Sequence, residues 1–131
     1  MARRTRKIAA VYQPARTCHS PSQKVVFQNN QPLPPGYELE GYRIDRQLSI
    51  GGFSIVYLAH DAKGTPVAIK EYLPNALALR GEGQIAPTIP PEYQGDFNRG
   101  LKCFFEEGRA LTGLDHPNVV RVLNFFRANQ T

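Results

Sequence analysis

Alternating apolar and polar positions in the middle of the chain predict three short β-strands. They are expected over residues 42–48, 54–60 and 65–72. In the first of them, Tyr42, Ile44 and Leu48 share the parity that a half-buried strand requires. The connections are short and rich in glycine, which favours hairpins. The pattern therefore predicts an antiparallel meander.

A helical period follows over residues 96–112. Its apolar stripe contains Phe97, Leu101, Phe104, Phe105, Leu111 and Leu114. Asp96 is the candidate N-cap and Gly113 the candidate stop. Gly100 and Gly108 lie inside the helix, and each costs about 1 kcal/mol relative to alanine. We therefore expect the helix to depend on packing against the sheet.

The remaining stretches are less regular. Residues 1–36 are polar, basic and rich in proline, which predicts a disordered arm before a domain at 37–131. Residues 80–95 contain many glycines and prolines and are expected to form a surface loop. A last strand is expected from Val119 to about Arg127.

Charge is distributed unevenly between the arm and the rest of the chain. The 131 residues hold 16 basic and 11 acidic groups, a net charge of +5. Six of the basic groups and none of the acidic groups lie in residues 1–36, which leaves ten basic against eleven acidic groups and a net charge of −1 for residues 37–131. Only the arm could attract nucleic acid or anionic lipid, and a solvated arm is the preferred interpretation.

The sequence supports neither a metal site nor a disulfide, and it does not indicate a membrane-spanning protein. The cysteines, Cys18 and Cys103, have no metal-ligand spacing, and they fit a reduced, cytoplasmic setting better than a disulfide. No apolar run approaches the roughly 18 residues of a membrane span.

Three features of residues 48–70 and the helix indicate a phosphate site. Lys70 ends the otherwise apolar run Val67–Lys70, and Glu107 lies on the apolar stripe of the helix. An ion pair between them would satisfy two charges that are costly to bury alone, although each could also reach solvent separately. The turn at Gly51-Gly52 would let a backbone approach phosphate closely, although such a turn is more often only a hairpin.

These segments, in this order, resemble the N-lobe of a protein kinase. The resemblance rests on Gly51–Val56, Val67–Lys70, Glu107 and His116–Val120, and the run IKEYLP at 69–74 is typical of bacterial serine/threonine kinases. It covers about residues 34–131. It implies an α+β fold, with strands one to four of the usual five-stranded antiparallel sheet and one helix that carries Glu107.

The resemblance implies ATP as the cofactor, with Mg²⁺ in the full-length kinase. Leu48 and Val56 would enclose the adenine beside Ala68, glycine-turn residues would cover the phosphates, and Lys70 would hold them with the support of Glu107. The complete set of implied nucleotide-binding residues is Leu48, Ser49, Ile50, Gly51, Gly52, Phe53, Ser54, Val56, Ala68, Lys70 and Glu107.

The sequence departs from the family pattern in three ways. Ser49 and Ser54 replace the outer glycines of the loop, which puts nucleotide affinity in doubt, and 36 residues separate Lys70 from Glu107. The 131 residues also contain no H-R-D and no D-F-G motif, so no catalytic base and no metal ligand is assigned. The resemblance ends before the fifth strand and the C-lobe of a kinase. We therefore expect unpaired edges in the sheet, and no phosphotransfer by this chain alone.

The preferred hypothesis is the ATP-binding half of a serine/threonine protein kinase, an enzyme by family, with protein substrates or a partner kinase chain. A non-catalytic, kinase-like interaction module is the first alternative. Nucleic-acid binding by the basic arm is the second and weaker alternative, so nucleic acid is not an expected partner.

Overall fold

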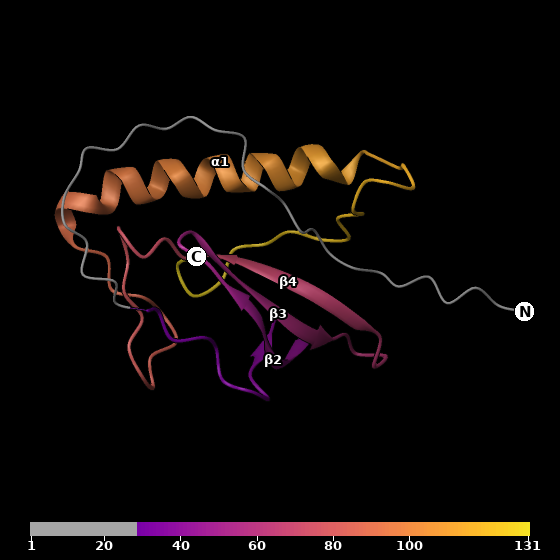
Figure 1. The fold of residues 1–131 in the computed structure, drawn as a ribbon, viewed down its shortest axis with the longest axis horizontal. Coiled ribbons are helices and arrows are strands. Elements are labelled where there is room, and N and C mark those ends of the chain that lie inside the picture. The colour runs from indigo at the N-terminus through magenta and orange to yellow at the C-terminus, as the bar shows by residue number, and fades with distance from the viewer. Residues whose placement is uncertain (1–28) are drawn as a thin grey trace, which may run out of the picture.

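A computed structural model describes residues 29–131, which form one antiparallel sheet beneath one long helix (Figure 1). Residues 1–28 lie outside the described part, and so do the predictions made for Cys18 and for the six basic groups of the arm. The strand order is β1-β2-β3-β4. The strands are β1 (Glu38–Leu39), β2 (Tyr42–Ile50), β3 (Ser54–His60) and β4 (Pro66–Tyr72). The predicted meander is therefore confirmed as β2, β3 and β4.

Period-two alternation places one face of the sheet in the core. On β3, Ile55, Tyr57 and Ala59 are buried, whereas Val56 and Leu58 between them are half-buried. The tight connection between β3 and β4 depends on Gly64, which has a positive φ, and on Asp61, whose carboxylate accepts two backbone hydrogen bonds. Each of these features was encoded locally in the sequence.

The predicted placement of Leu48 on the same face of the strand as Ile44 is wrong. Its side chain is 45% exposed, whereas Ile44 on the same strand is buried. The pairing of β2 with β3 shifts between Ile44 and Arg46 and again between Gln47 and Ser49. Such irregularities insert unpaired residues and reverse the parity of the later positions in the strand, so a strict alternation cannot be extrapolated across them.

The helix forms over nearly the predicted range. A 3₁₀ turn, η1 (Pro91–Tyr93), leads into α1 (Gln94–Thr112), and Gly113 follows its last residue as predicted. Asp96 lies in the first turn, 3.4 Å from Arg99, and is not the N-cap. Its negative charge still favours the helix N-terminus through the helix dipole.

Aromatic packing fixes α1 on the sheet. Phe97 and Leu101 are buried, and the Tyr72 ring lies 5.3 Å from the Phe97 ring and 5.6 Å from the Phe104 ring. A Cβ at Gly100 would overlap the Tyr72 hydroxyl. Gly100, which the helix pattern marked only as unfavourable, therefore allows α1 to approach β4 closely.

The connection between β4 and α1 is more than the predicted surface loop. Ala78, Arg80 and Pro87 are buried within it, and Leu79 forms an isolated antiparallel bridge with Thr88. The glycines and prolines exclude a helix or a long strand, as expected. They do not prevent the connection from contributing a charged residue to the core.

The folded region also begins earlier than the predicted boundary at residue 37. Asn30 and Leu33 are both 2% exposed, and Leu33 belongs to the hydrophobic core. The backbone amide of Gln31 donates to the carbonyl of Arg80 over 2.9 Å. Residues 29–36 are therefore part of the domain.

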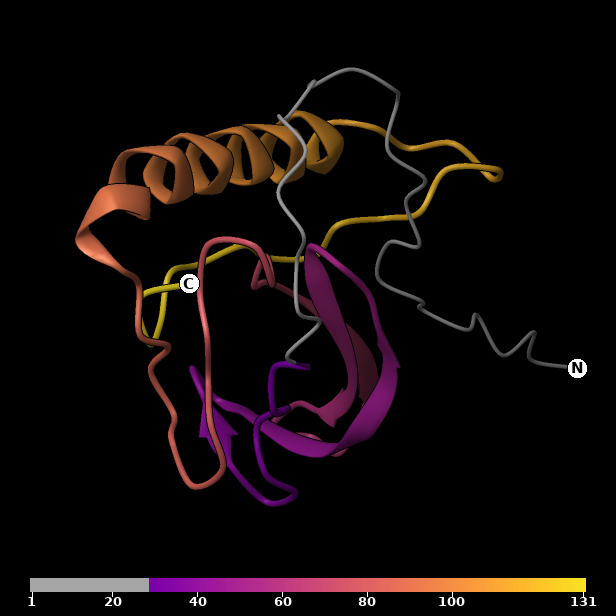
Figure 2. The same cartoon turned by 60° about the vertical axis from the view of Figure 1, so that its left-hand side comes forward.

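The predicted strand at 119–127 is wrong, since residues 114–131 contain no helix or strand. The segment runs back beneath α1 (Figure 2), where Phe125 packs edge-on against Phe105 at 4.7 Å. A cavity separates it from β4. A strand requires a hydrogen-bonding neighbour, and this segment has none within residues 29–131. In the described sheet β4 pairs only with β3, which matches the expectation of an unpaired edge.

Within residues 29–131, no helix is both long enough and apolar enough to cross a bilayer.

Candidate nucleotide site

The glycine turn connects β2 to β3 and is held through its carbonyl groups. The Gly51 amide donates to the Ser54 carbonyl over 2.9 Å inside the turn. The carbonyls of Gly52 and Phe53 accept from the amides of Asn75 and Leu73, over 2.9 and 2.8 Å. Because a trans peptide directs its N–H opposite to its C=O, the amide of Phe53 points away from residues 73–75.

Strand pairing brings the predicted residues together in one row. Val56 on β3 lies opposite Ser49 on β2 and opposite Lys70 on β4. Ala68 lies opposite Leu58, two positions along the same face as Lys70. Three consecutive strands thus bring these residues together beside the glycine turn.

The other predicted apolar residues are available to a ligand. Leu48 and Ile50 are 45% and 40% exposed, and Phe53 at the tip of the turn is 70% exposed. Exposed side chains of this size beside a glycine turn could cover a flat, apolar ring. Their role in nucleotide binding stays a prediction.

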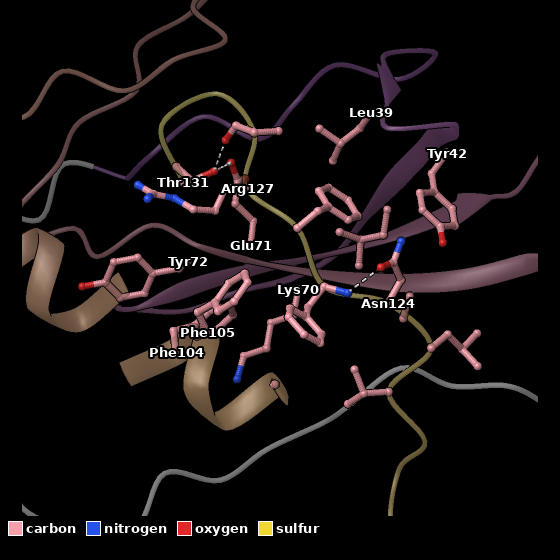
Figure 3. Close-up of a pocket in the computed structure, with 18 of the residues that line it drawn as sticks. Leu39, Tyr42, Lys70, Glu71, Tyr72, Phe104, Phe105, Asn124, Arg127 and Thr131 are labelled. Atoms are coloured by element: carbon pink, nitrogen blue, oxygen red, sulfur yellow. Dashed lines mark hydrogen bonds between the residues drawn. The ribbon is translucent and has the colours of Figure 1, made fainter. Parts of the chain in front are cut away.

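Lys70 and Glu107 line one cavity of about 180 Å³ between β4, α1 and residues 122–131. Figure 3 shows this cavity, with Lys70 among the labelled residues. The Lys70 ammonium lies 5.3 Å from the centre of the Phe104 ring, within range of a cation–π interaction. Glu107 is half-buried on the apolar stripe, whereas Glu106 is exposed and 3.9 Å from Lys102. Glu107 therefore lies on the packing face of α1, as its place on the apolar stripe predicted. The Lys70–Glu107 ion pair itself stays a prediction.

A buried ionic network, which the sequence did not reveal, begins at the residue after Lys70. Glu71 is 8% exposed, and both of its carboxylate oxygens accept from Arg80, over 2.7 and 2.8 Å. Arg80 is fully buried, and its remaining N–H groups donate to the Gln31 and Ile85 carbonyls and to the Tyr57 hydroxyl. All five guanidinium donors are therefore satisfied.

The network joins β3 and β4 to three other parts of the described chain. Tyr57 donates to Glu71 over 2.8 Å and accepts from the amide of Leu33 over 3.0 Å. The Thr131 hydroxyl donates to Glu71 over 3.1 Å. The strand that carries Lys70 is thereby tied to the N-terminal segment, to the long connection and to the last residue.

Burial and charge together set the protonation states of this network. Burial raises the pKa of Tyr57 above its usual range, and the adjacent Glu71 carboxylate raises it further. Burial acts against the charge on Arg80, but its hydrogen bonds and attraction to Glu71 outweigh that effect and raise its pKa. Arg80 stays charged and Tyr57 stays neutral at any physiological pH.

The raised pKa of Tyr57 predicts a loss of stability in alkali. The unfolded chain releases this proton near the ordinary value of 10.0, whereas the folded chain retains it to higher pH. The contribution is therefore complete below pH 10 and falls above it, by up to about 1.4 kcal/mol per pH unit. Urea unfolding measured from pH 9 to pH 11 should show this decline, and Tyr57→Phe should make it shallower. Equal slopes for the two proteins would contradict the assignment.

No group of three or more histidine, cysteine, aspartate or glutamate side chains is arranged to hold a metal ion within residues 29–131.

Known proteins of one class resemble this chain. The serine/threonine-protein kinase PknJ of Mycobacterium bovis and that of Mycobacterium tuberculosis are each 33% identical to it over 90 residues. The match covers 69% of this chain and 12% of each relative, so the chain spans a small part of these proteins. No protein-family model matches the chain.

A solved structure is similar to this chain in both fold and sequence. The apo form of PpkA-294 superimposes with a TM-score of 0.70 and is 35% identical. The match covers 75% of this chain and 35% of that structure. The curled four-stranded sheet and the single helix therefore form an arrangement that is known from experiment.

Proposed function

We propose that this chain, which is similar in sequence and fold to the N-lobe of a bacterial serine/threonine protein kinase, forms the ATP-binding half of such an enzyme. In the complete enzyme the reaction would be transfer of the γ-phosphoryl group of ATP to serine or threonine of a protein substrate. A cytoplasmic location is part of this proposal.

The observation that supports it best is the row formed by Ser49, Val56 and Lys70 across three strands, next to the glycine turn. A kinase N-lobe needs a small-residue turn above the phosphates and a lysine on the neighbouring strand beneath them. Here strand register alone provides that spacing.

The residues fit ATP in size and charge. Ala68 and Val56 leave room for a flat base on the face that carries Lys70, and the ammonium group complements the charge of the phosphates. Bound Mg·ATP would supply the transferable phosphoryl group. Glu107, which lines the same cavity as Lys70, would orient the lysine.

A second candidate function is binding of a partner chain, which exposed apolar residues in the last segment favour. Leu114, Val119 and Leu123 are 50%, 38% and 45% exposed. An interaction module would retain its partner without nucleotide and with Lys70 replaced.

Lys70→Met tests the nucleotide site. A hydrogen bond to a charged group contributes about 1.5–3 kcal/mol, so we expect Mg·ATP affinity to fall by roughly 10- to 100-fold. Isothermal titration calorimetry of the 131-residue chain measures it directly. Lys63→Met, at an exposed position in the β3–β4 connection, is the matched control and should bind as the unmodified chain does. Equal Mg·ATP affinity for Lys70→Met and Lys63→Met would contradict the proposal. So would the absence of any measurable heat of binding for the unmodified chain.

A further inference from the structure

Asn30 is a buried polar side chain whose hydrogen bonds extend toward the glycine turn. It is 2% exposed. Its amide nitrogen donates to Asn75 Oδ1 over 2.9 Å and to the Ala78 carbonyl over 3.2 Å, and its oxygen accepts from the Arg80 amide over 2.6 Å. An asparagine supplies both the donors and the acceptor that this site requires.

Asn75 is the link from Asn30 to the turn. Its side chain accepts from Asn30, and its backbone amide donates to the Gly52 carbonyl over 2.9 Å. Two residues earlier, the Leu73 amide donates to the Phe53 carbonyl over 2.8 Å. Residues 73–75 are therefore held by Asn30 on one side and hold the turn on the other.

The turn has little other support. Gly51, Gly52 and Phe53 are all exposed, and a side chain added at Gly52 would contact nothing within 4 Å. With so little packing, the hydrogen bonds from residues 73–75 determine where the Gly52 and Phe53 carbonyls point. Through the trans peptide they also determine where the Phe53 amide points.

We propose that Asn30 is a positioning residue, which fixes the glycine turn through Asn75 and so preorganises its amides for the nucleotide phosphates. The segment that precedes the sheet thereby becomes part of the nucleotide site without touching the ligand. This inference rests on the proposed function for its ligand, but the mechanical link can be measured without any ligand.

Asn30→Asp tests the link with almost no change in shape. The new carboxylate would face the Ala78 carbonyl, which cannot donate, so the contact would become repulsive. Gln31→Glu introduces the same charge at the neighbouring residue, whose side chain is exposed, and serves as the matched control. Asn75→Ala is the second variant. It removes Asn75 Oδ1, which accepts from Asn30, and leaves the other two hydrogen bonds of Asn30 in place.

Amide hydrogen exchange is the first readout. We expect the Leu73 and Asn75 amides to exchange about tenfold faster in Asn30→Asp and in Asn75→Ala, equivalent to the loss of one net hydrogen bond. The Gly64 amide, in the β3–β4 connection, and the amides of α1 should be unchanged, as should all amides in Gln31→Glu. Unchanged exchange at Leu73 and Asn75, or equal acceleration throughout the chain, would overturn the proposal.

Mg·ATP affinity is the second readout, measured on the same proteins. We expect about a tenfold loss in both Asn30→Asp and Asn75→Ala and no loss in Gln31→Glu. Faster exchange of the Leu73 and Asn75 amides with unchanged Mg·ATP affinity would overturn the role of Asn30 in nucleotide binding. Absence of binding by the unmodified chain would overturn the proposed function, and the exchange data would still decide whether Asn30 holds the turn.

Discussion

Arg80→Met is expected to destabilise the fold by about 3–5 kcal/mol, because it leaves the buried Glu71 carboxylate without its cation. Methionine fills most of the space but donates no hydrogen bond. The carbonyls of Gln31 and Ile85 and the Tyr57 hydroxyl also lose a donor. A loss of this size is a large part of the roughly 5–15 kcal/mol of a typical domain. Urea or thermal unfolding followed by circular dichroism measures it.

The control is Arg99→Met, which removes an exposed ion pair with Asp96 on the surface of α1. Such pairs contribute about 0–1 kcal/mol, so the midpoint should barely move. The double variant Glu71→Met/Arg80→Met should recover much of the loss, because no charge is then buried alone. Equal midpoints for Arg80→Met and Arg99→Met would show that the network does not stabilise the fold.

Gly100→Leu is expected to destabilise the fold by about 3 kcal/mol, the upper end of the usual range for overpacking. Helix propensity alone gives the opposite sign, because leucine is favoured over glycine by roughly 1 kcal/mol. The steric term prevails because the Tyr72 hydroxyl occupies the position of the new Cβ. The Tyr72 ring cannot easily move aside, since it is buried and packed against Phe97 and Phe104.

Gly95→Leu is the matched control on the same helix, at an exposed position with open space around the new Cβ. It should be neutral or slightly stabilising. Adding Tyr72→Phe to Gly100→Leu should recover part of the loss, because it removes the closest atom. Thermal unfolding of the parent chain and these variants decides the matter. A stabilising effect of Gly100→Leu would mean that α1 does not approach β4 as described.

Local patterns were enough to predict most of the secondary structure. The alternation around Tyr57 predicted β3 and its buried face, and Gly113 marked the end of α1. The run that ends at Lys70 predicted β4 and its place beside β3. The spacing of Glu107 from Phe104 correctly placed this carboxylate on the side of the cavity.

Other features depend on contacts between distant residues, which no local pattern reveals. A single arginine in a loop rich in glycine and proline suggests a solvated side chain, and only the fold brings Arg80 to Glu71 and Tyr57. The glutamate beside Lys70 was a partial signal, because it lies on a strand and faces the buried side. Asn30 gave no signal, since asparagine in a segment rich in proline is typical of a disordered arm.

The wrong strand predictions have the same origin. Leu48 kept the expected parity in sequence, but bulges in β2 changed the side on which it lies. Residues 119–127 have a composition suited to a strand, but a cavity separates this segment from the unpaired edge of β4, so it has no hydrogen-bonding partner strand in the described region. A strand needs a hydrogen-bonded partner strand, whereas the interior of a helix such as α1 forms its backbone hydrogen bonds between residues four apart in the same segment.

We expect the glycine turn and Lys70 together to hold the phosphates of a nucleotide. A titration of the ¹⁵N-labelled chain with Mg·ATP, followed by amide chemical shifts, tests it at the level of single residues. We expect the largest shifts at Gly51, Gly52, Phe53 and Lys70, and none at Gly64, in the β3–β4 connection. Shifts confined to other segments, or no shifts at millimolar Mg·ATP, would contradict this role of the glycine turn and Lys70.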